Sequence, residues 1–452
     1  MTGLIKFGAI GWMMSCLAAG AAWAQESTED LRKELLAMGG QMDATSGLLP
    51  SPGAPGALAP FLAEPMFDDS PTGSNTWLKT IKLSAFVDVG YTKNWNDPRT
   101  TLTNPGRMFD TNSNGFLFNM GEVMLEKVAS ADSPAGIRLK LGMGKDAGFL
   151  ASTENLGTSA QFDIVEGYVE YLAPIANGID FKVGKMATLA GYEVIESKDN
   201  WSYSRSLLFT WAIPLTHTGV RATYAFIDQI SLTLGYVNGW NMIADNNNGK
   251  TFEGQLNLNP TSWLNVIVNS YYGPELAPPG AAGNIGNTSG DQRYVVDVCA
   301  TVSWSTWKFG LNYDSGDDQQ LGPPNAKNPR GSPDNWGGTA VYVKDQLTRW
   351  YAPSIRAEYF RDGTGGVSGF VPSVAGAPAN TGFTIDNNGV TAAGKIHLWE
   401  VTLENEFKIN DNLIFRLEYR HDRASKDVFQ EGNDVKGRHG QDTIGAEAIF
   451  MF

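Results

Sequence analysis

Charged side chains of both signs are concentrated in one short stretch of the chain. Its members are Glu193, Glu196, Lys198, Asp199 and Arg205. An uncharged run of ten residues follows, from position 206 to position 215. That run is too short for a membrane-spanning helix, which needs about 20 apolar residues. Carboxylates and cations held this close together can screen charged solutes by sign and by orientation.

Residues suited to catalysis are scarce. His217 lies in PLTHTG and His421 in YRHDR, and neither belongs to a recognisable nucleophile motif. A serine hydrolase would need a serine beside a histidine and an orienting polar group. We therefore predict that the protein is not an enzyme and that it has no cofactor and no metal cluster. An outer-membrane enzyme stays open as the alternative.

The segment DTNSNG is similar to the start of a calcium-binding EF-hand loop. Asp110, Asn112 and Asn114 lie at the right spacing, but the position six residues after Gly115 is Gly121 where the pattern requires a glutamate. A strand pattern follows in place of a helix. Turn formation by Asp and Asn side chains accounts for the segment better.

The composition and the N-terminus indicate an exported protein without a nucleic-acid partner. The chain has 452 residues and a formal net charge of −14, so a basic footprint for nucleic acid is absent. Lys6, an uncharged run over 7–22 and the triplet Ala22-Trp23-Ala24 predict a signal peptide over 1–24. Its removal leaves Cys299 as the only cysteine, which excludes an internal disulfide.

Residues 25–78 are predicted to form a short N-terminal periplasmic extension. Ser27 can cap a helix over 26–44, because an acidic side chain follows three residues later. The stretch 51–60 is rich in Pro, Gly and Ala, which is typical of a linker.

From position 79 to the C-terminus, apolar and polar residues alternate in short segments. Such alternation predicts strands with one apolar and one polar face. We expect about sixteen strands, near 81–92, 115–128, 136–144, 161–172, 179–187, 216–226, 229–239, 250–259, 262–272, 292–304, 307–315, 337–346, 352–362, 395–408, 411–422 and 440–452. Long and short connections alternate between them. An even strand number with short turns at one end and long loops at the other predicts an all-β antiparallel transmembrane barrel over 79–452.

A soluble secreted β-rich binding protein is the other alternative, because its strands would also alternate. Such a protein has no reason to sort its loops by length. Aromatic residues near strand ends, such as Tyr271, Tyr272, Trp304 and Trp307, suit the two membrane interfaces. The chain also ends on Phe452 after an alternating strand, which is typical of outer-membrane barrels.

Several stretches of the chain resemble one protein family. They are SRSLLFTWAIPLTHTGVRATYAF, FDTNSNGFLFNMGEVMLEKVAS, IVEGYVEYLAP, DFKVGKMAT and SIRAEYFRDG. Together they resemble the OmpL-like branch of the β-barrel porins, over about 81–452. The resemblance implies a bacterial outer-membrane barrel that acts as a passive channel for small hydrophilic solutes, and it supplies no particular solute.

The stretch 188–215 is the third long connection and lies between the fifth and sixth expected strands. In sixteen-stranded porins the third loop folds inward, so we expect this stretch to narrow the pore. Its charged half would face the lumen and its apolar half the wall. Basic side chains expected on the inner wall are Lys82, Arg138, Lys140, Lys182, Arg356, Arg416 and Arg420. Acid on the loop opposite base on the wall would produce a transverse field.

One strand face is less apolar than the others. It carries Asn119 and Gly121 among Leu117, Val123 and Leu125. If this face pointed outward, Asn119 would meet lipid unfavourably, and a subunit interface would hide it. The sequence therefore predicts a homo-oligomer, such as a trimer, in contact with outer-membrane lipid.

Overall fold

The computed structural model describes residues 80–99, 102–154, 161–245, 247, 249–275, 292–322, 332–363, 385–386, 389–390, 395–433 and 437–452. All of them belong to one compact unit, Ser51–Phe452. The signal peptide predicted over 1–24 and most of the extension predicted over 25–78 lie outside the described residues, so both stay predictions. Among the described residues, no helix has the length and apolar character needed to cross a membrane.

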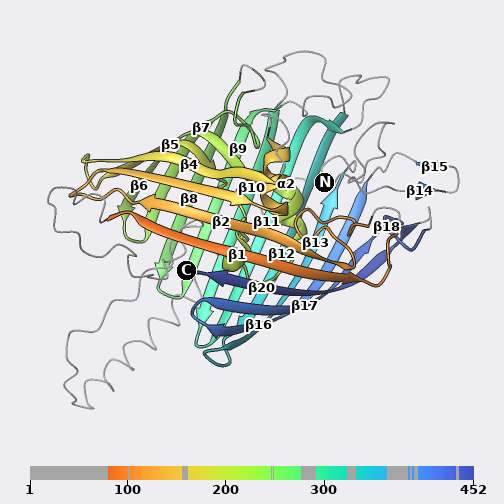
Figure 1. Ribbon diagram of the computed structural model, residues 1–452. Helices are drawn as coiled ribbons and strands as arrows, with labels where there is room; N and C mark the ends of the chain where they lie inside the picture. Colours follow the sequence, from red (N-terminus) through yellow and green to blue (C-terminus); the bar gives the residue numbers. More distant parts are fainter. Residues whose placement is uncertain are drawn as a thin grey trace, which may run out of the picture. The chain divides into compact units, whose positions relative to one another are not determined.

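Sixteen antiparallel strands close into a barrel, as the alternation and the loop lengths predict (Figure 1). They are β1 (Lys82–Asn94), β2 (Gly115–Lys127), β3 (Ala135–Met143), β4 (Phe162–Ala173), β5 (Ile179–Ala187), β6 (Thr216–Ile227), β7 (Ile230–Val237), β8 (Thr251–Thr261), β9 (Leu264–Pro274), β10 (Gln292–Trp304), β11 (Trp307–Gly322), β12 (Ser332–Asp345), β13 (Tyr351–Asp362), β16 (Ile396–Asn410), β17 (Leu413–Ala424) and β20 (Gly440–Met451). Neighbours in this order pair with each other, and β1 pairs with β20 to close the wall. Closure leaves the barrel sheet without an unpaired edge.

Short elements occur in the long connections. Two small ribbons pair β14 (Ile385–Asp386) with β15 (Gly389–Val390), and β18 (Phe429–Gln430) with β19 (Gly437–Arg438). The third long connection contains a 3₁₀ turn, η2 (Ser197–Asp199), and a π-helical turn, η3 (Leu208–Ala212).

The two faces of each strand have opposite character. On β16, Leu403 points outward and is 44% exposed, whereas its neighbour Glu404 points inward and is 1% exposed. On β1, Val87 is exposed and Asp88 is buried. The apolar side chains therefore form the outer surface of the barrel, and the polar side chains form its interior.

A bulge in β2 corrects the expectation for Asn119. The register with β1 shifts between Asp88 and Val89, so that Asp88 pairs with Met120 and Val89 with Phe118. The extra residue, Asn119, turns inward and its Nδ2 donates a hydrogen bond to Asp88 over 3.0 Å. A bulge inserts one residue and so reverses the facing of the residues after it. Asn119 therefore does not face lipid, and it gives no support for a subunit interface.

The second long connection contains a helix that the sequence analysis did not foresee. This helix, α2 (Lys145–Thr153), begins directly after β3. Side chains of Met120, Val165 and Ala147 fill the space next to Gly142. A Cβ added to Gly142 would lie 2.8 Å from the Met120 and Val165 side chains and 3.3 Å from the Cβ of Ala147. The glycine on the inner face of β3 thus makes room for the helix against the wall.

Candidate functional site: a loop inside the barrel

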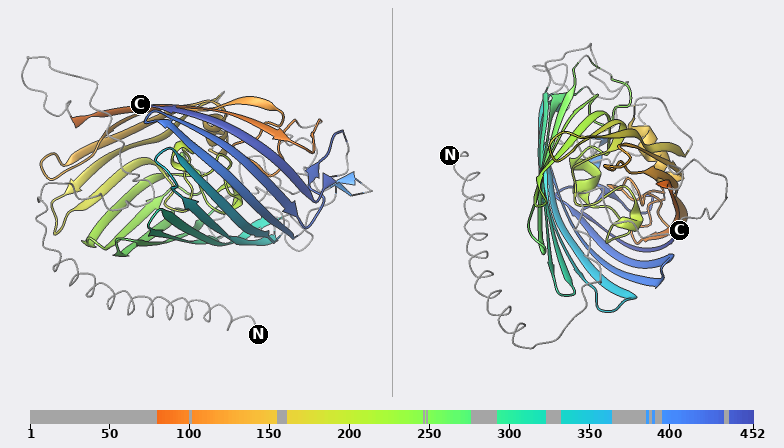
Figure 2. Two further views of the ribbon diagram at one scale, coloured as in Figure 1. Left: turned by 90° about the horizontal axis from the view of Figure 1, so that it is seen from below. Right: turned by 90° about the vertical axis from the view of Figure 1, so that its left-hand side faces the viewer.

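The connection between β5 and β6, residues 188–215, lies within the ring of strands, where Figure 2 shows it as a yellow-green segment. Hydrogen bonds tie it to distant parts of the wall. The backbone N–H of Leu189 donates to Tyr271 of β9 over 2.9 Å, and that of Tyr203 donates to Glu404 of β16 over 3.0 Å. We call residues 188–215 the inner loop.

Tyr271 corrects one part of the aromatic prediction. Its ring is 2% exposed and faces the inner loop, whereas its neighbour Tyr272 is 52% exposed on the outer surface. Trp304 and Trp307 are also exposed near strand ends. Alternation within a strand places adjacent tyrosines on opposite faces, so only Tyr272 of this pair can reach a membrane interface.

An arginine of β13 connects the charged half of the inner loop to the wall. The Arg356 guanidinium contacts Glu193 of the loop and Glu400 of β16, each over 2.7 Å. It also donates to the backbone carbonyl of Ser204 over 2.7 Å and to the Thr402 hydroxyl over 3.1 Å. Arg356 is fully buried. A buried ion pair is tolerated when further hydrogen bonds satisfy both partners, as they do here.

Wall carboxylates that the sequence analysis did not single out bind backbone amides of the inner loop. The N–H of Ser204 donates to Glu418 over 2.9 Å. The N–H groups of Leu207 and Leu208 donate to Glu358 over 2.5 and 3.2 Å. Glu358 and Glu418 occupy inward positions of β13 and β17, so the alternation pattern could have identified them as interior acids. What it could not show is that their partners are amides.

Two arginines of β17 bind carbonyl oxygens of the same loop. Arg416 donates to the Ser197 carbonyl over 2.9 Å and to the Asn200 carbonyl over 2.7 Å. Arg420 donates to the carbonyl of Arg205 over 2.6 Å. Both guanidinium groups are 1% exposed. The expected basic wall residues of β13 and β17 therefore hold the loop largely through its backbone.

Glycines on the inner wall accept the bulky side chains of the inner loop. A Cβ added to Gly90 of β1 or to Gly445 of β20 would overlap the Tyr203 ring. In the same way, Tyr192 occupies the space above Gly310, and Leu208 lies close to Gly338. The absence of side chains at these wall positions thus leaves the space that the loop side chains occupy.

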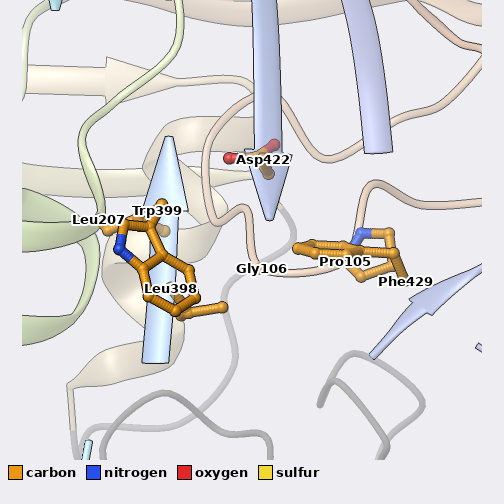
Figure 3. A pocket seen from close by; sticks show the side chains of 7 residues that line it. All are labelled: Pro105, Gly106, Leu207, Leu398, Trp399, Asp422 and Phe429. Carbon is orange, nitrogen blue, oxygen red and sulfur yellow. The ribbon is translucent and has the colours of Figure 1, made fainter. Parts of the chain in front are cut away.

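The apolar half of the inner loop packs against the wall near the long-loop end. Leu207, Leu208 and Phe209 are each at most 4% exposed. The Trp336 indole of β12 donates to the Ala212 carbonyl over 3.0 Å. Figure 3 shows a small pocket at this level. It is lined by Pro105, Gly106, Leu207, Leu398, Trp399, Asp422 and Phe429.

Of the other predicted loop residues, Glu196 reaches the wall. It pairs with Lys140 of β3. Burial opposes ionisation of Glu196, but attraction from Lys140 and Lys198 outweighs it, so the pKa of this carboxyl lies below its ordinary value. Lys198 pairs with its own neighbour Asp199 over 2.5 Å. Arg205 donates to the carbonyls of Tyr203 and Ile195 within the loop, and its guanidinium lies over the Phe109 ring of the first long connection, 5.0 Å from the ring centroid.

Three of the predicted wall residues do not contact the loop. Lys82 is exposed at the start of β1. Arg138 pairs with the wall acids Glu126 and Glu166. Lys182 contacts Glu170 and Asp180, also on the wall, each over 3.4 Å.

The first and second long connections add charges beside the loop. Arg107 contacts both Asp110 and Asp422. Asp110 is thus held by an ion pair in the connection before β2, and its part in an Asx turn stays a prediction. Asp146 of α2 is buried with an unsatisfied oxygen. Burial, reinforced by Glu447 and Asp110 and opposed by Arg205, raises the pKa of Asp146 to about 7.

One of the two histidines considered for catalysis, His217, has structural neighbours. His217 is 1% exposed, its ring stacks on Tyr271 with centroids 5.1 Å apart, and its Nδ1 lies 3.0 Å from the Gly239 carbonyl oxygen. Within the part of the chain that the structure describes, no group of His, Cys, Asp and Glu side chains is placed to hold a metal ion.

A closed, lipid-facing barrel with an internal loop defines an outer-membrane barrel protein of the porin class. The chain belongs to the family described as "Putative beta-barrel porin-2, OmpL-like", which residues 80–452 match. The protein is therefore an outer-membrane protein, and this class indicates a channel rather than an enzyme. The soluble alternative is wrong. No curated protein matches the sequence.

Solved outer-membrane barrels share the fold. A loop L8 deletion mutant of OmpT, an outer membrane protein of Vibrio cholerae, is 11% identical with a TM-score of 0.52, over 82% of this chain and 99% of that one. An anion-selective porin from Comamonas acidovorans is 10% identical with a TM-score of 0.51, over the same shares. OmpT in a trimer form is 12% identical with a TM-score of 0.50, again over 82% and 99%. At these identities the likeness shows the fold alone.

Proposed function

We propose that this barrel allows passive diffusion of small hydrophilic solutes and ions across the outer membrane, and that the inner loop sets the width of the path. The observation that carries the proposal is the position of residues 188–215 inside the wall, held by strands on several sides. No turnover chemistry is needed, because the rate and selectivity of such a channel come from its width and charge.

The contacts of the inner loop explain how it can keep a fixed position against a flow of solutes. Its backbone N–H groups are bound by Glu358, Glu404 and Glu418, and its carbonyls are bound by Arg416 and Arg420. Hydrogen bonds that include a charged partner are about twice as strong as neutral ones. The wall side chains that bind the loop are buried, so the loop lies directly against β13, β16 and β17. A path of this kind would admit ions and small solutes only.

Removal of residues 193–205 tests the proposal. Single-channel conductance in a planar bilayer is expected to rise, because the charged half of the loop would no longer narrow the path. Heat-dependent mobility on a gel reports whether the shortened barrel has folded. Asp411→Asn, at a turn residue whose side chain is 87% exposed, is a control that should leave conductance unchanged. A folded deletion variant with unaltered conductance would contradict the proposed role of the loop.

We also propose that the barrel forms a homo-oligomer, for which a trimer is the first candidate. The support is the trimer form of one solved barrel with the same fold. Chemical crosslinking in mild detergent should capture species larger than one chain. Crosslinking that yields monomers alone would exclude the oligomer.

A further inference from the structure

Most of the basic side chains inside the barrel contact two carboxylates each. They are Arg107 with Asp110 and Asp422, Arg138 with Glu126 and Glu166, Lys140 with Glu166 and Glu196, Lys182 with Glu170 and Asp180, Lys185 with Glu154 and Asp163, Arg356 with Glu193 and Glu400, Arg416 with Glu406 and Glu447, and Arg420 with Glu400 and Asp422. Others, such as Arg221 with Glu253, contact one. The positive charge of the interior is therefore matched or exceeded locally by carboxylates.

Further carboxylates face the inner loop and form no ion pair among the described residues. Glu358, Glu404 and Glu418 accept hydrogen bonds from loop N–H groups. An amide N–H is a dipole, so it stabilises a carboxylate without removing its charge. Among the described residues no ion pair neutralises these three acids, so the wall that holds the loop carries more acidic than basic groups.

A pair of aspartates lies on another side of the interior and contributes at most one negative charge, because two carboxyl groups in contact share a proton. Asp297 of β10 and Asp314 of β11 are register partners and both are fully buried. Asp297 accepts hydrogen bonds from the side-chain amides of Asn269 over 2.5 Å and Asn312 over 2.6 Å. The Asp314 carboxyl lies within reach of Asp297 and of the Asn312 amide. No lysine or arginine forms an ion pair with either aspartate in the described part of the chain.

We infer that the pore selects cations over anions. This inference rests on the proposed channel function and names the class of solute that it passes. Fixed charges of one sign in a narrow path with low-dielectric walls raise the local concentration of the opposite ion and exclude ions of the same sign. The arginines alone suggest the reverse preference, but their carboxylate partners cancel it. The anion-selective porin from Comamonas acidovorans shares the fold at 10% identity, so the sign for this chain is argued from its own side chains.

The reversal potential of the full-length protein in a planar bilayer tests the sign directly. With a gradient of KCl across the bilayer at neutral pH, the expected sign is that of K⁺ permeating faster than Cl⁻, by several-fold. The ratio should fall towards one as the pH is lowered, because carboxylates lose their charge on protonation. Each charge removed from the path changes the ratio, since unit charges interact strongly at the effective dielectric of a protein interior.

A paired substitution assigns part of the selectivity to the aspartates. Asp297→Asn with Asp314→Asn keeps the side-chain size and removes the charge, and we expect the ratio of K⁺ to Cl⁻ permeability to fall by about threefold. Asp132→Asn with Asp411→Asn makes the same two substitutions at exposed turn residues and should leave the ratio unchanged. Heat-dependent gel mobility shows that each variant is folded.

The outcomes separate this inference from the proposal on which it rests. A wild-type protein that forms no conducting channel would overturn the proposed function. A conducting wild-type channel that prefers Cl⁻, or that has no preference, would overturn cation selectivity and leave the channel function standing. If the wild type and the folded Asp297→Asn, Asp314→Asn variant have equal ratios of K⁺ to Cl⁻ permeability, the two aspartates are not the source of the cation selectivity.

Discussion

Two parts of the inner wall differ in the polar groups that they present. The strands β13, β16 and β17 carry ionised groups, among them Arg356, Glu400 and Arg420, which bind the inner loop or one another. The strands β6 to β9 present mostly neutral groups that bond across strands. Their pairs are Thr223 with Thr233, Gln255 with Asn269, and Asn257 with Asn265. We call these the charged wall and the amide wall.

The difference shows that polarity on the inner face does not by itself create a binding surface for the loop. Both walls follow from the same alternation of residues. The amide wall satisfies its hydrogen bonds largely between its own strands, and it meets the loop at few points, such as Gln255 with the Leu189 carbonyl over 3.2 Å. Charged groups bind backbone groups more strongly, so the charged wall determines where the loop lies.

The largest expected effect follows from breaking the charged wall. Arg356→Ala leaves Glu193 buried without a cation and Glu400 with Arg420 alone. The loss of one partner of such a pair costs about 3–5 kcal/mol of unfolding free energy. Gln255→Ala on the amide wall should cost about 1–3 kcal/mol, because only neutral hydrogen bonds are left unmade. Urea unfolding in lipid vesicles, followed by tryptophan fluorescence, measures both. Equal losses in the two variants would show that the two walls do not differ in this way.

A pH-dependent effect is expected at Asp146, which lies on neither wall. Its pKa in the folded protein is about 7, above the ordinary 3.8, so the folded state favours the protonated acid. Stability is lost as the pH rises from about 4 to about 7. Asp146→Asn removes this loss, so the variant should match the wild type near pH 4 and exceed it above pH 7, by up to ~4 kcal/mol. A difference between the two proteins that does not change with pH would contradict the shifted pKa.

A smaller effect is expected where the loop meets β1. Gly90→Ala places a methyl group against the Tyr203 ring, and overpacking of this kind costs about 1–3 kcal/mol. It should also displace the loop and alter single-channel conductance. The matched control is Gly254→Ala on β8, where the added carbon meets its nearest neighbour, Leu234, at 3.7 Å. If the two substitutions have equal effects on conductance, Tyr203 does not position the loop.

The number of strands and the facing of most residues could be predicted from the sequence. Alternation is a local property, and each strand carries its own copy of the pattern. The prediction failed at Asn119, because a bulge depends on how two strands align and leaves no mark in either strand alone. The sequence analysis also missed helix α2, because its nine residues are too few and too mixed in character to show the apolar stripe by which a helix is recognised.

The candidate site was predictable in part. The basic residues Arg356, Arg416 and Arg420 were expected on the inner wall because their strands place apolar residues on the opposite face. Their partners were not predictable. Glu193 and Arg356 are far apart in the chain, and the contact between them arises only when the third loop enters a closed barrel. The sequence analysis expected acidic residues on the loop and basic residues on the wall. It therefore did not foresee the wall carboxylates that accept hydrogen bonds from backbone amides of the loop.

The sequence by itself determined which side chains point into the barrel, because a strand has a period of two and one of its faces must be apolar against lipid. It also indicated that one connection, 188–215, differs from an ordinary solvated loop. The tertiary structure alone decided which charges neutralise each other. That choice depends on strand register, on barrel closure and on the path of the inner loop, and these bring together groups that no local pattern relates.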